Sequence, residues 1–139
     1  MIPDMIFKSL GHSCKGYKMY KDGQSLEQGY KPDYVLKKDD NYIILESENS
    51  SSRKTFVGGL IKAAHYLQEE RTGILVFIIV PKKNTKASSI SSHLKKYFDW
   101  IKDSTNLREI HVIEAGHYLN EEKVVKLLSR DFKKLAHSI

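Results

Sequence analysis

The chain has 139 residues, of which 40% are hydrophobic and 29% charged, and it carries a formal net charge of +6. This length fits a single domain, residues 1–139, with a sizeable core, and the composition excludes a disordered chain. The longest apolar run, Ile74 to Pro81, is too short to cross a membrane, which takes roughly 20 apolar residues in a helix. The single cysteine, Cys14, excludes an internal disulfide and a zinc site built from cysteines. Because no signal peptide is recognisable, we expect a cytoplasmic protein.

The first thirty residues carry the least regular pattern. Ile2 to Leu10 is consistent with a short helix, and Tyr17 to Tyr20 is consistent with a strand. The pattern then sharpens into a β-hairpin. Its two strands, Tyr34 to Lys37 and Tyr42 to Glu48, are rich in β-branched and aromatic residues, and the turn-forming residues 38–41 separate them.

Helices and strands alternate in the rest of the chain. Apolar side chains recur at helical spacing in three segments, from about Arg53 to Glu70, from about Ser89 to Lys102 and from about Asn120 to Ala136. The nearly continuous apolar run of Gly73 to Pro81 is typical of a central strand that is buried on both faces, and Arg108 to Glu114 is a further strand. This order predicts an α/β fold with a mixed β-sheet flanked by helices.

Three carboxylates on the predicted hairpin form a candidate site. Glu46 and Glu48 are two residues apart in one strand, so their side chains point to the same face. Asp33 opens the partner strand, and antiparallel pairing can bring it beside either glutamate. Gathered carboxylates repel one another unless a cation offsets their charge, and hard oxygen ligands favour Mg²⁺, Mn²⁺ or Ca²⁺ over zinc. A divalent ion held here could promote hydrolysis of a phosphodiester. The alternative is a solvated hairpin with acidic residues on its wet face.

Pro32-Asp33, followed after twelve residues by Glu46-Ser47-Glu48, resembles the active-site motif of the PD-(D/E)XK nuclease superfamily, which has the restriction-endonuclease-like fold. The family's hairpin, helix, strand, helix and strand match about Tyr30 to Glu114. The resemblance implies a Mg²⁺- or Mn²⁺-dependent endonuclease in which Asp33 and Glu46 bind the metal. Glu48 occupies the position of the usual lysine, as in some type II restriction endonucleases, and is implied to bind metal or to help activate the water. The identity of the general base therefore stays open.

Four further residues are candidates for the same site. Family members with a displaced lysine suggest Lys62 on the following helix, although its angle, opposite the apolar stripe, favours a solvated surface lysine. Arg53 and Lys54 lie at the start of that helix, where they could bind a phosphate or simply be surface charges. Glu27 is the only glutamate before the motif, and some family members are similar in using a glutamate from this region.

An excess of basic residues favours a polyanionic partner, of which nucleic acid is the commonest. The lysines that we expect to contact DNA lie among N-terminal tyrosines and in the loop after the apolar strand; they are Lys18, Lys31, Lys82 and Lys83. For the N-terminal lysines, an ordinary amphipathic hairpin is the alternative. We expect a DNA endonuclease of restriction, resolution or repair that acts as a homodimer or as a subunit of a larger complex. The alternative function is a non-catalytic nucleic-acid-binding or assembly module with the same fold.

Overall fold

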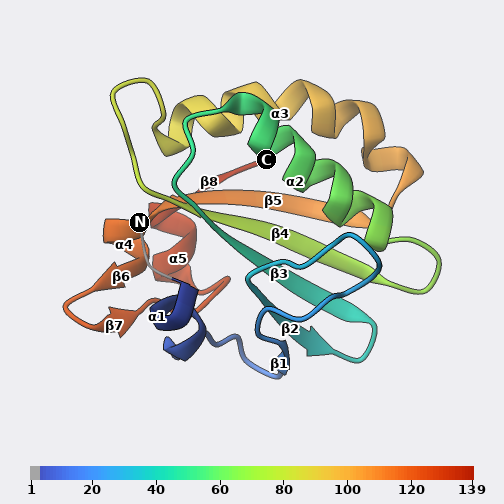
Figure 1. The fold of residues 1–139 in the computed structure, drawn as a ribbon, viewed down its shortest axis with the longest axis horizontal. Helices are drawn as coiled ribbons and strands as arrows, with labels where there is room; N and C mark the ends of the chain where they lie inside the picture. Colours follow the sequence, from blue (N-terminus) through green and yellow to red (C-terminus); the bar gives the residue numbers. More distant parts are fainter. Residues whose placement is uncertain (1–3) are drawn as a thin grey trace.

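A mixed six-stranded sheet forms the centre of the computed structural model, which describes residues 4–139 (Figure 1). Its strand order is β1-β2-β3-β4-β5-β8. The strands are β1 (Lys18–Lys21), β2 (Tyr34–Lys38), β3 (Asn41–Glu48), β4 (Thr72–Ile79), β5 (Leu107–Glu114) and β8 (His137–Ser138). Strands β3, β4 and β5 are parallel, whereas β1, β2 and β8 pair antiparallel with their neighbours. The α/β fold with a mixed sheet flanked by helices is therefore confirmed.

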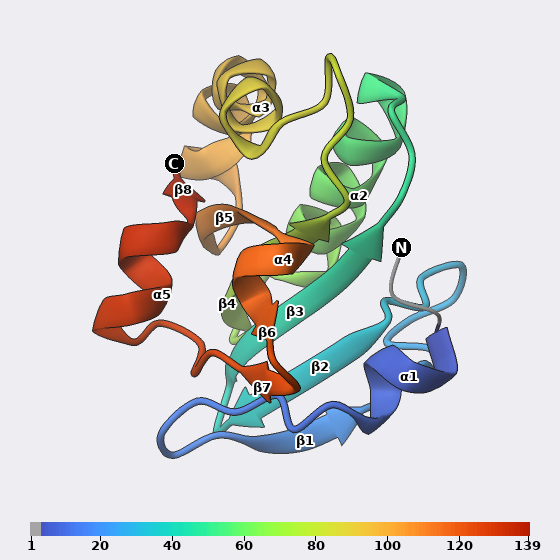
Figure 2. The same cartoon turned by 90° about the vertical axis from the view of Figure 1, so that its left-hand side faces the viewer.

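Helices cover both faces of this sheet, as the two views in Figures 1 and 2 show. The long helices α2 (Arg53–Tyr66) and α3 (Ala87–Ile101) connect the parallel strands and pack on one face; a 3-10 turn, Lys102–Ser104, follows α3. The opposite face carries the short helices α1 (Asp4–Ser9), α4 (Ala115–Tyr118) and α5 (Arg130–Leu135). A small hairpin of β6 (Leu119–Asn120) and β7 (Lys123–Val124) lies between α4 and α5 in the chain.

Alternation along β3 explains why the sheet has two separate cores. Ile44 packs with the residues of α2 and α3, while Ile43 and Leu45 pack with those of α1, α4 and α5. Successive side chains of a strand point to opposite faces, so Glu46 continues the face of Ile44, toward α2. The predicted orientation of the hairpin residues is confirmed. Because β3, β4 and β5 are parallel, their carboxyl ends and the first turns of α2 and α3 lie at the same edge of the sheet (Figure 1).

The predicted hairpin and its turn are also confirmed. Strands β2 and β3 pair antiparallel with Tyr34 opposite Leu45 and Lys38 opposite Asn41. Asp39 adopts a φ of 53° in the turn between them, a conformation that aspartate tolerates better than most residues. The turn therefore fixes the register that the site depends on.

The helix predicted from Asn120 to Ala136 is wrong. This segment forms the β6–β7 hairpin, an extended connection and the six-residue helix α5. Glu121, Glu122 and Leu128 have φ values of 50°, 66° and 62°, and the interior of a right-handed helix does not accommodate such values. Apolar residues of the segment are nevertheless buried, because Leu127 and Phe132 belong to the second core.

Smaller differences concern α2 and the N-terminus. Helix α2 ends at Tyr66, four residues before the predicted end. Of the helix expected over Ile2 to Leu10, residues 2 and 3 lie outside the described part, and α1 accounts for most of the remainder. Among the described helices, none is long and apolar enough to cross a membrane.

Candidate active site

The open end of the β2–β3 hairpin places Asp33 directly beside Glu46. Tyr34 pairs with Leu45, so the residue before Tyr34 lies next to the residue after Leu45. The backbone N–H of Asp33 donates to Glu46 Oε1 at 3.2 Å, and the backbone N–H of Ser47 donates to Asp33 Oδ2 at 2.7 Å. A main-chain N–H of each segment therefore orients the carboxyl group of the other segment.

The environment of Glu46 disfavours its negative charge. Burial is the largest cause and the nearby Asp33 charge the second, and together with Glu48 they raise the pKa of Glu46 to about 8. The backbone N–H of Asp33 and the Lys62 ammonium act in the opposite direction but do not cancel the increase. Glu46 is consequently largely protonated at neutral pH unless a cation is close by, and binding a cation there would release a proton.

Glu48 lies on the same face of β3, but its carboxylate turns toward the loop that follows. Glu48 Oε1 accepts hydrogen bonds from the backbone N–H groups of Asn49 at 3.0 Å and Ser50 at 2.8 Å. These bonds order the turn between β3 and α2. Glu48 therefore has a structural use, which the sequence motif does not reveal.

A hollow of about 250 Å³ lies over Glu46 and Glu48. On the side of α2, Gly58 and Gly59 line it with backbone alone, and Thr55 and Lys62 contribute side chains. A Cβ atom on Gly59 would come within 3.0 Å of the Phe77 ring and 3.9 Å of Glu46 Oε2. The glycine thus lets the helix approach the end of β3 closely. The residues that line the hollow are Tyr30, Lys31, Glu46, Glu48, Thr55, Gly58, Gly59, Lys62 and Phe77.

Lys62 lines this hollow and is not remote from the carboxylates. Its Nζ donates to the backbone oxygen of Gly29 at 3.1 Å, which ties α2 to the segment leading into β2. Although the side chain is exposed, its charge lowers the pKa of Glu46 relative to burial alone. The sequence favours a solvated surface lysine, and the side chain is exposed as expected. It also borders the hollow because residues 29–31 cross over this side of α2, which helical periodicity alone does not indicate.

Tyr30 is a site residue that the sequence analysis did not assign. The residue is 3% exposed and lines the hollow, and its hydroxyl has no hydrogen-bond partner among the described residues. Burial raises the pKa of Tyr30, and the charges of Glu46, Glu27 and Asp33 raise it further. A buried, unpartnered hydroxyl beside acidic groups is unusual in a folded protein. The signal in the sequence was its position, three residues before Asp33.

The other candidate residues are spread around the site. Glu27 Oε2 lies 2.8 Å from His65 Nδ1 on α2, outside the lining of the hollow. Arg53 donates to the backbone oxygen of Asn84 at 2.7 Å and, with Lys54, lines a neighbouring groove.

The four lysines expected to contact DNA are not gathered at one place. Lys31 lines the acidic hollow, and Lys18 lies on the edge strand β1. Lys82 and Lys83 lie exposed in the loop between β4 and α3. The structure therefore brings only Lys31 to the lining of the hollow.

A metal ion would find oxygen donors here, but not the expected ligand set. Among residues 4–139, no group of three His, Cys, Asp or Glu side chains is arranged to hold a metal ion. Glu48 is engaged by its own loop, so the three-carboxylate cluster is not formed. The pair of Asp33 and Glu46 nevertheless fits Mg²⁺, which is commonly held by one or two carboxylates together with waters and substrate phosphates.

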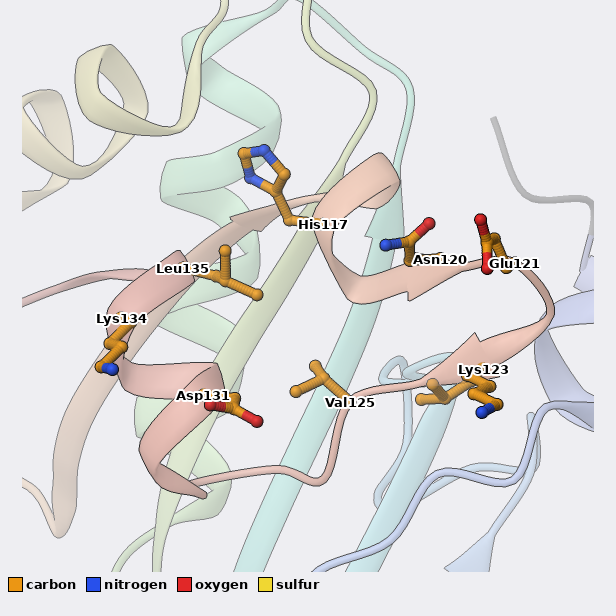
Figure 3. A pocket seen from close by; sticks show the side chains of 9 residues that line it. His117, Asn120, Glu121, Lys123, Val125, Asp131, Lys134 and Leu135 are labelled. Carbon is orange, nitrogen blue, oxygen red and sulfur yellow. The ribbon is translucent and has the colours of Figure 1, made fainter.

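A second hollow, on the other side of the sheet, is not lined by any of the three candidate carboxylates. It measures about 410 Å³ and lies between the β6–β7 hairpin and α5. Figure 3 shows its side chains pointing from α4, β6, β7 and α5, with Asp131 and Lys134 on the same short helix. No strand of the large sheet contributes to its lining. The hollow over Glu46 is therefore the better candidate for chemistry.

Comparisons with known proteins give a distant fold likeness. No described protein family and no curated protein matches the chain by sequence. Among solved structures, the chain is similar to SfsA from Pyrococcus furiosus in complex with Ca²⁺, with 16% sequence identity and a TM-score of 0.41. The match covers 72% of this chain and 48% of that protein, so the chain spans about half the length of SfsA. A likeness at this level gives no information about activity.

Proposed function

We propose that this protein is a metal-dependent endonuclease that hydrolyses phosphodiester bonds of DNA, with a domain of the restriction-endonuclease-like fold. One observation carries the proposal: Asp33 and Glu46 are held side by side by main-chain hydrogen bonds, and the pKa of Glu46 is raised to about 8. Clustered acids of this kind are a liability to the fold unless they serve a cation or a proton transfer. The net charge of +6 favours a polyanionic substrate, and Lys31 and Lys62 in the lining of the hollow can pair with its phosphates.

In this proposal Mg²⁺ or Mn²⁺ bound by Asp33 and Glu46 would supply Lewis-acid stabilisation of the scissile phosphate and a more acidic bound water. Asp33 is oriented by the Ser47 N–H, so its carboxylate is fixed before a ligand arrives. Glu46 must release its proton to act as a ligand, and the Lys62 ammonium favours that release. Glu48 keeps the loop after β3 in place and lends negative charge to the hollow.

Lys62 takes the place of the missing motif lysine in this proposal. It lines the same hollow as Glu46 and Glu48, and its ammonium is anchored by the carbonyl of Gly29. An ammonium in this position can pair with a non-bridging phosphate oxygen and offset charge that develops during hydrolysis. The assignment explains how the site could work with glutamate at position 48.

One site of this type cuts one strand, and cleavage of both strands requires two sites. We therefore propose that the protein acts as a homodimer or as a subunit of a larger restriction, resolution or repair assembly. Light scattering measures the mass in solution. A monomer that makes double-strand breaks in a single binding event would contradict this part of the proposal.

The test is cleavage of supercoiled plasmid, of branched DNA and of RNA in Mg²⁺, in Mn²⁺ and in EDTA. We expect metal-dependent nicking or linearisation that falls by orders of magnitude in Asp33→Asn and Glu46→Gln. Lys62→Gln should reduce cleavage while leaving the fold intact. The control is Glu122→Gln, an exposed glutamate in the β6–β7 turn that should cleave normally. Full activity in both Asp33→Asn and Glu46→Gln would refute the proposed site.

A second candidate function, a non-catalytic nucleic-acid-binding or assembly module with the same fold, is favoured by one observation. The described residues contain no three-ligand group, and Glu48 is used by its own loop. Titration calorimetry separates the two functions, because a pure binding module should bind DNA equally well with and without Mg²⁺ and should bind no Mg²⁺ through Asp33.

A further inference from the structure

A groove between α2 and α3 adjoins the acidic hollow. It measures about 500 Å³ and is lined by Arg53, Lys54, Val57 and Gly58 of α2 and by His93 and Tyr97 of α3. Gly58 also lines the acidic hollow, so the two depressions are neighbours on one surface. A polymer bound at Glu46 therefore passes close to the groove.

The groove is positively charged. Arg53 and Lys54 bring two cations to its lining, and no acidic side chain is among the residues that line it. A third cation lies close by, since Lys96 Nζ is 5.2 Å from the centroid of the Tyr97 ring. The positive charges near the groove also act on His93. Burial lowers the pKa of His93 most, and the charges of Lys96 and Arg53 lower it further. These charges favour an anionic ligand over a cationic one.

The groove also offers flat, polarizable side chains. The His93 and Tyr97 rings lie 5.4 Å apart with an angle of 56° between their planes, and Val57 adds an apolar surface. Tyr97 and Val57 are partly buried against the core, which limits their movement. Aromatic side chains in a basic groove are the combination with which proteins stack unpaired bases while pairing the backbone phosphates. An acidic peptide would use the charges but would have no need of the rings.

We propose that this groove binds an unpaired nucleotide of the nucleic acid that is cleaved at the acidic hollow, with its base against Tyr97 and His93 and its phosphate near Arg53 and Lys54. The inference rests on the proposed function and deepens it. It assigns the preferred substrate class, because a base held in the groove cannot be paired. Single strands and the single-stranded part of a branched or flapped DNA should bind best, since a duplex must first release a base from its pair.

The experiment measures binding without chemistry. Fluorescence anisotropy in EDTA compares a labelled oligothymidylate of about 12 nucleotides, a length within the usual site size of single-strand binders, with a duplex of equal length. We expect tighter binding of the single strand. Tyr97→Leu, which keeps an apolar side chain but removes the ring, should weaken that binding about tenfold, as expected when one stacked base is lost. Tyr97→Phe should bind like the wild type.

Two further variants keep the test decisive if Tyr97→Leu folds poorly. Arg53→Gln changes a side chain outside the core and should lower both the affinity and its dependence on salt. Trp100→Ala is the matched control, since Trp100 is 77% exposed on the same helix but does not line the groove. Its affinity should stay unchanged.

Three outcomes would overturn the inference. The first is tighter binding of the duplex than of the single strand, and the second is unchanged single-strand binding in both Tyr97→Leu and Arg53→Gln. The third is that polyglutamate displaces the labelled oligonucleotide as well as unlabelled oligothymidylate does. These outcomes are separable from failure of the proposed function. If the wild type does not cleave DNA but binds single strands through Tyr97, the nuclease proposal fails and the groove stands. If it cleaves DNA while the groove variants bind normally, the groove proposal fails alone.

Discussion

The backbone N–H of Asp33 donates to the carboxylate of Glu46 at 3.2 Å across the open end of the β2–β3 hairpin. The hydrogen bond joins two acids that electrostatics would separate, and the return bond from Ser47 N–H to Asp33 completes a reciprocal arrangement. Strand pairing therefore holds the two carboxyl groups together, and the raised pKa of Glu46 leaves that group mostly uncharged at neutral pH. The proximity of the carboxylates is a property of the fold and does not require a bound cation.

Glu46 should make the stability of the metal-free protein depend on pH. The folded state holds the Glu46 proton up to about pH 8, whereas the ordinary pKa of 4.5 applies after unfolding. The folded state therefore binds more protons between these pH values, and the free energy of unfolding falls as pH rises through this window. The slope should be on the order of 1 kcal/mol per pH unit.

Urea unfolding between pH 5 and pH 9 in EDTA measures this slope. Glu46→Gln, which cannot ionise, should lose most of it and should be more stable than the wild type at pH 9. Glu122→Gln is the control and should behave like the wild type. An identical slope in the wild type and in Glu46→Gln would show that the burial of this carboxyl has no thermodynamic effect.

Mg²⁺ or Mn²⁺ should raise the melting temperature, because a ligand that binds only the folded state stabilises it. The effect should be larger at pH 8 than at pH 6, since Glu46 must lose its proton before it can bind the cation. Differential scanning fluorimetry with and without metal tests this. The double variant Asp33→Asn, Glu46→Gln serves as the control, and an equal shift in that variant would place the cation elsewhere.

Glu48 should stabilise the folded protein through its hydrogen bonds to the loop after β3. Glu48→Ala removes the acceptor of the Asn49 and Ser50 N–H groups and should cost about 1 kcal/mol in the free energy of unfolding. Glu48→Gln keeps an acceptor oxygen and should unfold like the wild type. Chemical denaturation measures both variants. If Glu48→Ala is as stable as Glu48→Gln, the loop does not depend on these bonds.

Tyr30→Phe should leave the metal-free protein equally stable or more stable, by up to about 1 kcal/mol. The substitution removes a buried hydroxyl that has no hydrogen-bond partner among the described residues. Tyr118→Phe is the matched control, because the Tyr118 hydroxyl lies 2.6 Å from His12 Nδ1 in the opposite core and its loss should be destabilising. Melting curves of both variants in EDTA decide the point. A loss of stability in Tyr30→Phe equal to that in Tyr118→Phe would reveal a partner for its hydroxyl.

The hairpin and the central strand were predictable because their signals are local. Period-two alternation fixes which way Glu46 points, and the turn residues fix where Asp33 meets it. The end of the chain was not predictable in the same way. Val124, Leu127 and Phe132 have helical spacing, yet the left-handed conformation at Leu128 interrupts any helix through them, and burial in the second core satisfies them instead.

The candidate site was predictable only in part, because only some of its contacts follow from local patterns in the sequence. Asp33 directly precedes β2 and Glu46 lies in the adjacent strand β3, so the pairing of these strands places the two acids together. Lys62 and Tyr30 join them because the segment before β2 passes over α2, and the sequence carries no periodic signal for such a crossing. Glu48 was identified by position, but its bonds to Asn49 and Ser50 depend on the backbone path of the loop.

The pair of glycines in α2 gives the hollow a boundary whose shape does not depend on rotamers. A wall of helix backbone at Gly58 and Gly59 has no side chain to order when a ligand enters, so little conformational entropy is lost on that side. A Cβ atom at position 59 would come within 3.0 Å of the Phe77 ring, which belongs to the central strand β4. A larger residue there would require the ring or the helix to shift, so the close approach of α2 to the carboxylates depends on a residue that has no side chain.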